Sequence, residues 1–301
     1  MADLGASLLA KLKNKAKAAN INNQQIVRLF FQEEFLRRLS KSAYAENFIL
    51  KGGLFIYTLT NFQSRSTVDI DFMLRRIDNS PERLDKVIAE ILAVPTGLND
   101  VVILEPGKSA PIAVQREYHG VSCQITGYIK KVRLPFSVDI GVGDMIVPKP
   151  EKRVIQTQLD GYDAPYVYTY SLESTIAEKF DAILQRFELT GRMKDFYDIY
   201  YLALAFEFDG EKLRAALFET LKNRKTSINQ DSFERVLRLV EDDDIQVRWR
   251  HFQKTINQTG LSLSDVMSLI DIFLHPVFDA VLSGDNLMLN WKAHKREWEL
   301  K

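Results

Sequence analysis

The spacing of hydrophobic residues predicts that helices and strands alternate over the first part of the chain. Apolar residues recur every three or four positions in several segments before residue 95, which indicates amphipathic helices. Short runs in which apolar residues alternate with polar ones, or follow one another, indicate strands. We expect helices within residues 7–39, 54–59 and 81–92, and strands at residues 48–50, 68–74, 101–104, 121–128 and 134–140.

From about Leu172 onward, helical spacing continues almost without interruption. Helices are expected at residues 177–187, 196–205, 211–221, 233–240 and 263–282, and the acidic run 241–244 reads as a solvated loop. The composition shifts near Pro165, which marks a candidate domain boundary. We therefore predict an α+β fold, with a mixed sheet and helices in residues 1–165 and an all-helical domain in residues 166–301.

The composition is that of a globular protein with a substantial core. Of the 301 residues, 46% are hydrophobic and 27% are charged. The single cysteine, Cys123, excludes an intramolecular disulfide and a cysteine-based zinc site, and we expect it to be buried. Forty basic residues balance forty acidic ones, which indicates no general polyanion-binding surface but leaves room for a local basic patch.

Neither a zinc-protease site nor a membrane segment is expected. The four histidines include no pair four residues apart, so the zinc-binding motif of those proteases is missing. The first twenty residues lack the apolar core of a signal peptide, and no apolar run reaches the length of a membrane span. We therefore expect a cytoplasmic protein.

The strongest candidate site begins at a glycine-rich turn. Lys51-Gly52-Gly53 lies between a predicted strand and a predicted helix. Glycines at such a turn let backbone N–H groups approach a phosphate, and the N-terminus of the following helix adds partial positive charge. On its own a Gly-Gly pair is more often an ordinary turn, so it indicates a phosphate site only in combination with neighbouring motifs.

Two carboxylates come next in the chain, on the predicted strand in the segment Arg65–Asp71. Asp69 and Asp71 are two residues apart, so both side chains project from one face while Ile70 points into the core. Two carboxylates on one face repel each other unless a cation lies between them, and Mg²⁺ prefers oxygen ligands. Together the turn and the strand predict a metal–triphosphate site for nucleotidyl transfer.

A second group of charged residues lies about 100 residues further along the chain. Lys179 is on a predicted helix, and Arg192, Lys194, Asp195 and Asp198 surround the start of the next one. Asp195 and Asp198 are three residues apart on that helix, so they share a face. Taken alone, these residues would be an ordinary charged surface.

In sequence order, these segments resemble the motifs of a known family. Lys51–Gly53 followed by the Asp69/Asp71 strand is similar to the glycine and paired-carboxylate motifs of the DNA-polymerase-beta-like nucleotidyltransferases. With Lys179–Ala182 and Arg192–Asp198 added, the pattern resembles the AbiEii-type nucleotidyltransferase toxins over roughly residues 20–280. The resemblance implies a nucleotidyltransferase-fold domain followed by a helical domain that completes the active-site cleft.

The resemblance also implies a role for each motif residue. Lys179 would neutralise triphosphate charge, and Asp195 would approach the metal or act as a general base. The catalytic residues would be Asp69, Asp71, Lys179 and Asp195, and the nucleotide-binding residues would be Lys51, Gly52, Gly53, Thr67, Arg192 and Lys194.

The third metal-binding carboxylate has two candidates. Enzymes of this superfamily usually add one from a later strand, and Asp139 lies on such a predicted strand. Either Asp139 binds metal together with Asp69 and Asp71, and Asp195 has another role, or Asp195 takes the place of Asp139.

As the resemblance implies, the chain would be the toxin of a two-gene bacterial system, neutralised by a separately encoded antitoxin. It would use a nucleoside triphosphate with two Mg²⁺ ions and cause growth arrest or abortive phage infection. The expected acceptor is the 3′ end of a tRNA. A protein side chain or a small molecule is an alternative acceptor, and a nucleotide-binding regulatory module without turnover is an alternative of another class. No membrane partner is expected.

Overall fold

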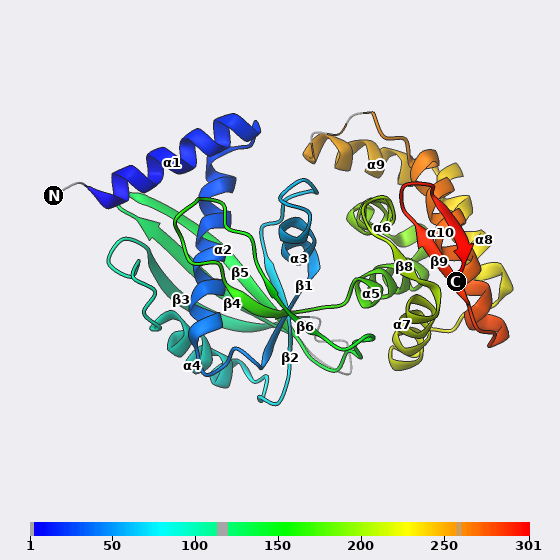
Figure 1. The fold of residues 1–301 in the computed structure, drawn as a ribbon, viewed down its shortest axis with the longest axis horizontal. Helices are drawn as coiled ribbons and strands as arrows, with labels where there is room; N and C mark the ends of the chain where they lie inside the picture. Colours follow the sequence, from blue (N-terminus) through cyan, green and yellow to red (C-terminus); the bar gives the residue numbers. More distant parts are fainter. Residues whose placement is uncertain (1–2, 113–119, 257, 259) are drawn as a thin grey trace. The chain divides into compact units, whose positions relative to one another are not determined.

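The computed structural model describes residues 3–112, 120–256, 258 and 260–301, which belong to two compact units (Figure 1). Unit 1 comprises Met1–Gly143 and Glu151–Thr169, and unit 2 comprises Asp144–Pro150 and Tyr170–Lys301. Unit 1 mixes helices with a large sheet, and unit 2 is mainly helical. The predicted α+β class is therefore confirmed.

Unit 1 is built on a mixed sheet with strand order β3-β4-β5-β2-β1-β7-β6. β2 pairs in parallel with β5, and β1 pairs in parallel with β7, whereas the other neighbours are antiparallel. The strands are β1 (Phe48–Lys51), β2 (Ile70–Leu74), β3 (Ile103–Ile112), β4 (Gly120–Ile129), β5 (Val132–Gly141), β6 (Glu151–Val154) and β7 (Tyr166–Thr169). The helices are α1 (Leu4–Ala19), α2 (Asn23–Lys41), α3 (Gly52–Leu59) and α4 (Pro81–Leu92).

Helix α2 covers one face of this sheet. Asn22 caps the helix by accepting a hydrogen bond of 2.8 Å from the Gln24 amide. The ring of Phe35 packs on that of Phe72 in β2, with centroids 6.1 Å apart, and both rings are fully buried. Because neighbouring residues of a strand point to opposite faces, Asp71 lies on the face that α2 leaves uncovered.

Helix α2 is fixed by charges inside the protein. Arg37 pairs with both Glu33 and Glu34, and Arg38 pairs with Glu34 at 3.0 Å, all with side chains at most 5% exposed. The Arg38 guanidinium also donates to the carbonyls of Leu92 and Val102. Every charge therefore has a partner, which burial of charge requires.

Unit 2 packs its helices around an aromatic core. The ring of Phe180 contacts Phe233 and Phe278, with centroids 5.4 and 6.2 Å away. Buried Trp291 donates its indole N–H to the Ala203 carbonyl at 2.7 Å. The α-helices are α5 (Leu172–Leu184), α6 (Met193–Ala205), α7 (Gly210–Asn223), α8 (Gln230–Leu237), α9 (Asp243–Thr255) and α10 (Leu263–Ser283), with short 3₁₀ helices at Phe187–Leu189 and Arg238–Glu241.

Two features of unit 2 differ from the sequence-based expectation. A three-stranded sheet of β8 (Phe208–Asp209), β9 (Leu289–Lys292) and β10 (Glu297–Leu300) accompanies the helices. The acidic run 241–244 is also not a loop, because it contains the start of α9. Asp242 accepts from the Ile245 amide at 2.9 Å as the cap, and the next two aspartates lie in the first turn, where the helix dipole favours negative charge.

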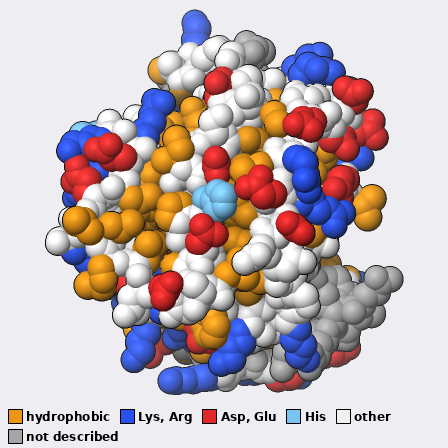
Figure 2. All heavy atoms as spheres, turned by 90° about the vertical axis from the view of Figure 1, so that its right-hand side faces the viewer, with side chains coloured by type: hydrophobic (Ala, Val, Ile, Leu, Met, Phe, Trp, Pro, Cys, Tyr) orange, Lys and Arg blue, Asp and Glu red, His pale blue; other side chains and the backbone are white. Residues whose placement is uncertain are grey.

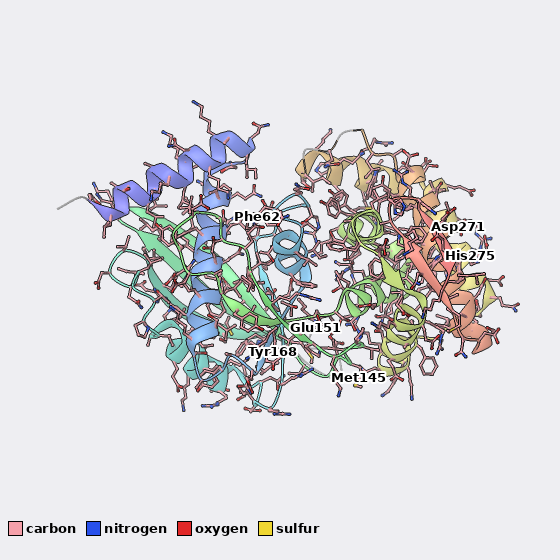
Figure 3. The ribbon with its side chains drawn as sticks, in the orientation of Figure 1. Phe62, Met145, Glu151, Tyr168, Asp271 and His275 are labelled. Atoms are coloured by element: carbon pink, nitrogen blue, oxygen red, sulfur yellow. The ribbon has the colours of Figure 1, made fainter. Side chains whose placement is uncertain are left out.

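Helix α10 corrects the expectation that no apolar run reaches membrane-spanning length. It has 21 residues and, among the described residues, is by length and composition alone long and apolar enough to cross a membrane. Half of its most apolar 18-residue stretch is buried inside the protein. Its outer side carries His275, whose Nδ1 lies 2.8 Å from Asp271, and charged side chains surround the apolar ones on this face (Figures 2 and 3). These features are typical of a core helix with one polar side.

Candidate active site

The glycine turn and the first carboxylate strand meet in unit 1. β1 ends at Lys51, which pairs with Asp71 of β2. Gly52 has a φ of +69°, which side chains disfavour, and a Cβ there would lie 2.0 Å from Asp71 Oδ2. Both the backbone conformation and the packing therefore require glycine at residue 52. In consequence, the Asp71 carboxylate lies directly against the turn.

Thr67 returns to the same turn from the other side. A Cβ at Gly53 would lie 3.0 Å from both Thr67 Cβ and Thr67 Oγ1, so a side chain at Gly53 would push this segment away. Helix α3 begins at Gly52, and Lys51 caps it without a side-chain hydrogen bond. The first backbone N–H groups of α3 thus lie beside Thr67, in an arrangement that attracts anions.

Three carboxylates share the uncovered face of the sheet. Asp69 lies one residue before β2, and Ile70 between the two aspartates is fully buried, as expected. In the parallel pairing of β2 with β5, Asp71 is the register partner of Asp139. Residues in register on adjacent strands project from the same face, so Asp139 joins the pair.

Two serines hold these carboxylates, and sequence analysis missed both. Ser137 Oγ donates to Asp69 Oδ1 at 2.5 Å, and Ser122 Oγ donates to Asp139 Oδ1 at 2.6 Å. Ser137 is two residues from Asp139 on β5, and that spacing is a signal in the sequence. Ser122 lies opposite Asp139 on β4, a relation that only the strand register reveals.

The carboxylates interact electrostatically. Burial raises the pKa of Asp139, and the negative charges of Asp71 and Asp69 raise it further, although the serine hydroxyls act in the opposite direction. Among the described residues, no group of three or more His, Cys, Asp or Glu side chains has the arrangement of a complete metal site. The oxygen donors and their crowded negative charge nevertheless fit a hard divalent cation whose remaining ligands come from elsewhere.

The second motif forms a separate charge cluster in unit 2. Lys179 of α5 donates to Asp195 Oδ1 at 3.1 Å and to Asp198 Oδ2 at 2.6 Å, both on α6. The Arg192 guanidinium pairs with the other oxygen of Asp195. Asp195 and Asp198 are almost fully buried, and the Lys179 side chain is 10% exposed. Lys179 is therefore not the ordinary surface lysine of the alternative interpretation.

The ion pairs determine the protonation of Asp195. Burial raises the pKa of its carboxyl, but the charges of Lys179 and Arg192 outweigh burial and hold that pKa below its usual range. A carboxylate of low pKa is a weak base. The neighbouring Lys194 is exposed and lies outside this cluster.

A neighbouring network on α5 was not predicted. Arg224 of α7 pairs with Glu178 at 3.1 Å, with Asp181 at 3.1 Å and with Asp144 at 2.9 Å. Because Glu178 and Asp181 flank Lys179 in sequence, this network anchors α5 on the side next to the lysine. The predicted residues thus form two groups, Lys51, Gly52, Gly53, Thr67, Asp69, Asp71 and Asp139 in unit 1, and Lys179, Arg192 and Asp195 in unit 2.

The remaining candidate nucleophile is excluded by its surroundings. Cys123 is buried as expected, at 2% exposure, and burial raises the pKa of its thiol to about 11. The reactive thiolate is therefore scarce at neutral pH.

Comparisons with known proteins match the chain to one family and to two solved folds. Residues 34–283 match the model of the family described as nucleotidyl transferase AbiEii toxin, type IV TA system. The fold is similar to that of JHP933 from Helicobacter pylori, with a TM-score of 0.51 and 16% identity over 87% of this chain and 95% of that one. The fold is also similar to that of a candidate nucleotidyltransferase from H. pylori. The TM-score is 0.50, and the identity is 15% over 89% of this chain and 100% of that one. No curated protein matches the chain.

The crowding of the carboxylates predicts how Asp139→Asn changes stability with pH. Asp139 ionises near pH 3.8 in the unfolded chain but at higher pH in the folded one, so its charge destabilises the fold at neutral pH. The variant should melt at a higher temperature than the wild type at pH 7 in EDTA. This gain in melting temperature should disappear as the pH falls below 3.8, where Asp139 of the wild type is protonated in both the folded and the unfolded protein.

Melting curves between pH 3 and pH 8 test this, with Asp100→Asn, at an exposed position, as the control. A variant that melts below the wild type at pH 7, or a gain that persists at acid pH, contradicts carboxylate crowding.

Proposed function

The chain belongs to the AbiEii nucleotidyl transferase toxin family. From that premise we propose that it transfers a nucleotidyl group from a nucleoside triphosphate to the 3′ end of a tRNA. A 3′-terminal hydroxyl oxygen would bond to the α-phosphorus and give up its proton to solvent, while the bond from the α-phosphorus to the β-phosphate breaks and pyrophosphate leaves. The observation that carries this proposal is the contact between the Asp71 carboxylate and the Gly52 turn. It joins the two groups that a metal–triphosphate substrate needs, backbone N–H donors for the phosphates and carboxylates for the cation.

The triphosphate binds at the start of α3. Gly52 and Gly53 let Asp71 and Thr67 approach the backbone there, and the first N–H groups of a helix favour an anion. Lys51 adds positive charge, and the Thr67 hydroxyl donates to a phosphate oxygen. This hydroxyl is 3.4 Å from the Asp69 carbonyl, a weak contact that a phosphate can replace.

Asp69, Asp71 and Asp139 would hold two Mg²⁺ ions. The bound ions would neutralise the charge that develops on the transferring phosphorus group and on the leaving oxygens. The protein's part is to hold the carboxylates on one face. Ser137 and Ser122 do this in the unliganded state by donating to Asp69 and Asp139.

The motif residues of unit 2 are given roles in the same proposal. Lys179 neutralises triphosphate charge, and Arg192 binds phosphate as well as pairing with Asp195. The low pKa of Asp195 supports a positioning role, in which it keeps Lys179 and Arg192 charged and oriented, over proton abstraction. Asp139 is accordingly the better candidate for the third metal ligand. Lys194, which is exposed, contacts the nucleotide or the acceptor.

In the cell, nucleotidyl transfer to tRNA would stop translation, and we propose this as the basis of growth arrest and abortive phage infection. A separately encoded antitoxin neutralises the effect. The cytoplasm, where nucleoside triphosphates and tRNA are found, is the proposed location. A labelled nucleotide distinguishes the alternatives. It would appear in protein or in a small molecule if one of these is the acceptor, and in neither these nor RNA if the chain is a regulatory module without turnover.

The first prediction concerns Asp69→Asn. Purified protein is incubated with each α-labelled nucleoside triphosphate, Mg²⁺ and a cell lysate, and the label is followed into RNA, protein and small molecules. Wild type should label tRNA at its 3′ end, and the nearly isosteric variant should lose the activity by on the order of 100-fold or more. Asp100→Asn, an exposed aspartate on a turn, is the matched control.

Label found in protein or in a small molecule would show that this molecule, and not tRNA, is the acceptor. No label with tight triphosphate binding would indicate a regulatory module. Full activity of Asp69→Asn would overturn the metal site.

The second prediction concerns Lys179→Met. Mg²⁺ with a non-hydrolysable triphosphate should raise the melting temperature of wild type by on the order of 5 °C, because a ligand of the native state stabilises it. The variant should lose most of this shift. Its basal melting temperature should also fall, since Asp195 and Asp198 lose a buried cation.

A double variant, Lys179→Met with Asp198→Asn, removes one carboxylate together with the ammonium group that pairs with it. It should recover basal stability without recovering the ligand-induced shift. A full shift in either variant would place Lys179 outside the phosphate site.

A further inference from the structure

Two segments of unit 1 carry basic residues without acidic ones. Residues 4–32 contain four lysines and one arginine, residues 120–138 contain two lysines and one arginine, and neither segment has a single Asp or Glu. The other 32 basic residues share the rest of the chain with all 40 acidic ones. The neutral total therefore conceals a strong local excess of positive charge.

The two segments are adjacent in space. The Lys130 ammonium, at the β4–β5 turn, pairs with Asp3 just before α1, and the Lys130 side chain lies against Gly5. Arg28 of α2 donates to the Pro135 carbonyl of β5 at 3.2 Å. In Figure 1 the N-terminal end of α1 lies beside the turn between these strands. We call the joint region the basic surface, formed by Lys11, Lys13, Lys17, Arg28, Lys131 and Arg133.

Helix α1 turns these lysines outward. Its apolar side, Leu8, Leu12 and Ala16, is buried, and α1 packs on α2. Lys11, Lys13 and Lys17 are exposed, as are Lys131 and Arg133, whereas Arg28 is half-buried. Like charges four residues apart, such as Lys13 and Lys17, destabilise a helix. Helix stability therefore does not account for this charge pattern.

Two nearby charged groups serve the fold instead and are left out of the surface. Lys15 donates to the Gln158 carbonyl, and its ammonium lies 5.3 Å from the centre of the Phe62 ring, which is labelled in Figure 3. Asp3, the acidic residue that precedes α1, forms an ion pair with Lys130. What remains on the surface is positive charge with solvent access, and Glu105 lies at its border, where it shares the Tyr128 hydroxyl with Arg133.

We propose that the basic surface binds the phosphate backbone of the RNA acceptor, an inference that rests on the proposed function. A polyanion fits because the charges are spread over two helices and a strand turn, where a mononucleotide would reach only a few of them. Arg133 and Asp139 lie six residues apart on β5, or roughly 20 Å. An RNA on the basic surface thus spans several nucleotides before its end reaches the carboxylates.

A membrane surface fits less well. An amphipathic helix binds lipid by inserting its apolar face, and the apolar residues of α1 are buried inside unit 1. Residues 4–33 also precede the part of the chain that matches the family, so α1 lies outside that match. The lysines of α1 are therefore a feature of this chain itself and are not carried over from the family match.

The test compares three triple variants of the full-length protein. Lys11, Lys13 and Lys17 are changed together to Ala, or together to Arg, and the control changes the exposed helix lysines Lys86, Lys212 and Lys254 to Ala. Binding of bulk tRNA is measured by fluorescence anisotropy from 50 to 300 mM salt. Vesicles containing phosphatidylserine form a second arm. Labelling of tRNA and the triphosphate-induced melting shift are measured in parallel.

The Ala triple variant should bind tRNA about 10- to 100-fold more weakly at 0.1 M salt, and the slope of log affinity against log salt should fall by about 2, as expected for three lost phosphate contacts. The Arg variant and the control should bind like wild type, and all variants should keep the triphosphate-induced shift. Equal weakening in the Ala variant and the control, or binding to vesicles but not to tRNA, overturns the basic surface as an RNA site.

The two hypotheses fail separately. If wild type binds tRNA through these lysines but labels no RNA, the proposed function is wrong and the basic surface stands. If wild type labels tRNA and the Ala variant labels it equally well at limiting tRNA, the basic surface is wrong and the proposed function stands.

Discussion

The close approach of the Asp71 carboxylate to the backbone of Gly52 is the constraint on which the candidate site depends. It requires a residue without a Cβ at the end of β1, and it places the first N–H groups of α3 next to a carboxylate. The pairing of Lys51 with Asp71 and of Asp71 with Asp139 then extends the same face across three strands. The partial positive charge of the helix start favours the neighbouring Asp71 carboxylate, and the remaining negative charge of the cluster fits the cation of a nucleoside triphosphate, which binds as a complex with Mg²⁺. The chemistry we propose results from that juxtaposition.

The charged residues around Lys179 in unit 2 are paired with opposite charges, unlike the three carboxylates of unit 1. Around Asp69, Asp71 and Asp139 negative charges crowd, and the pKa of Asp139 rises. Around Lys179, two cations and two carboxylates lie together, and the pKa of Asp195 falls. A cluster that is already neutralised holds its groups in a fixed arrangement but gives up basicity. This contrast supports a metal-binding role for Asp139 and a positioning role for Asp195.

Much of the fold and of the site could be predicted from local patterns. The two-residue spacing of Asp69 and Asp71 around buried Ile70 predicted a shared face. The features that were missed are non-local or marginal. Ser122 reaches Asp139 only through the register of β4 and β5, and β8 has two residues, too few for a pattern. The acidic run at 241–244 was misread because aspartates favour both loops and helix starts.

Calorimetric binding of a non-hydrolysable nucleoside triphosphate to Gly52→Ala, in Mg²⁺ and in EDTA, tests the proposed site most directly. The added methyl group would meet Asp71 and displace it from the turn. Gly97→Ala is the matched control, since Gly97 has a φ of +82° but no atom within 4 Å of its ideal Cβ, so it carries the backbone strain without the contact. We expect Mg²⁺-dependent binding in wild type and Gly97→Ala, and its loss in folded Gly52→Ala. Undiminished binding to Gly52→Ala would contradict a triphosphate site at this turn.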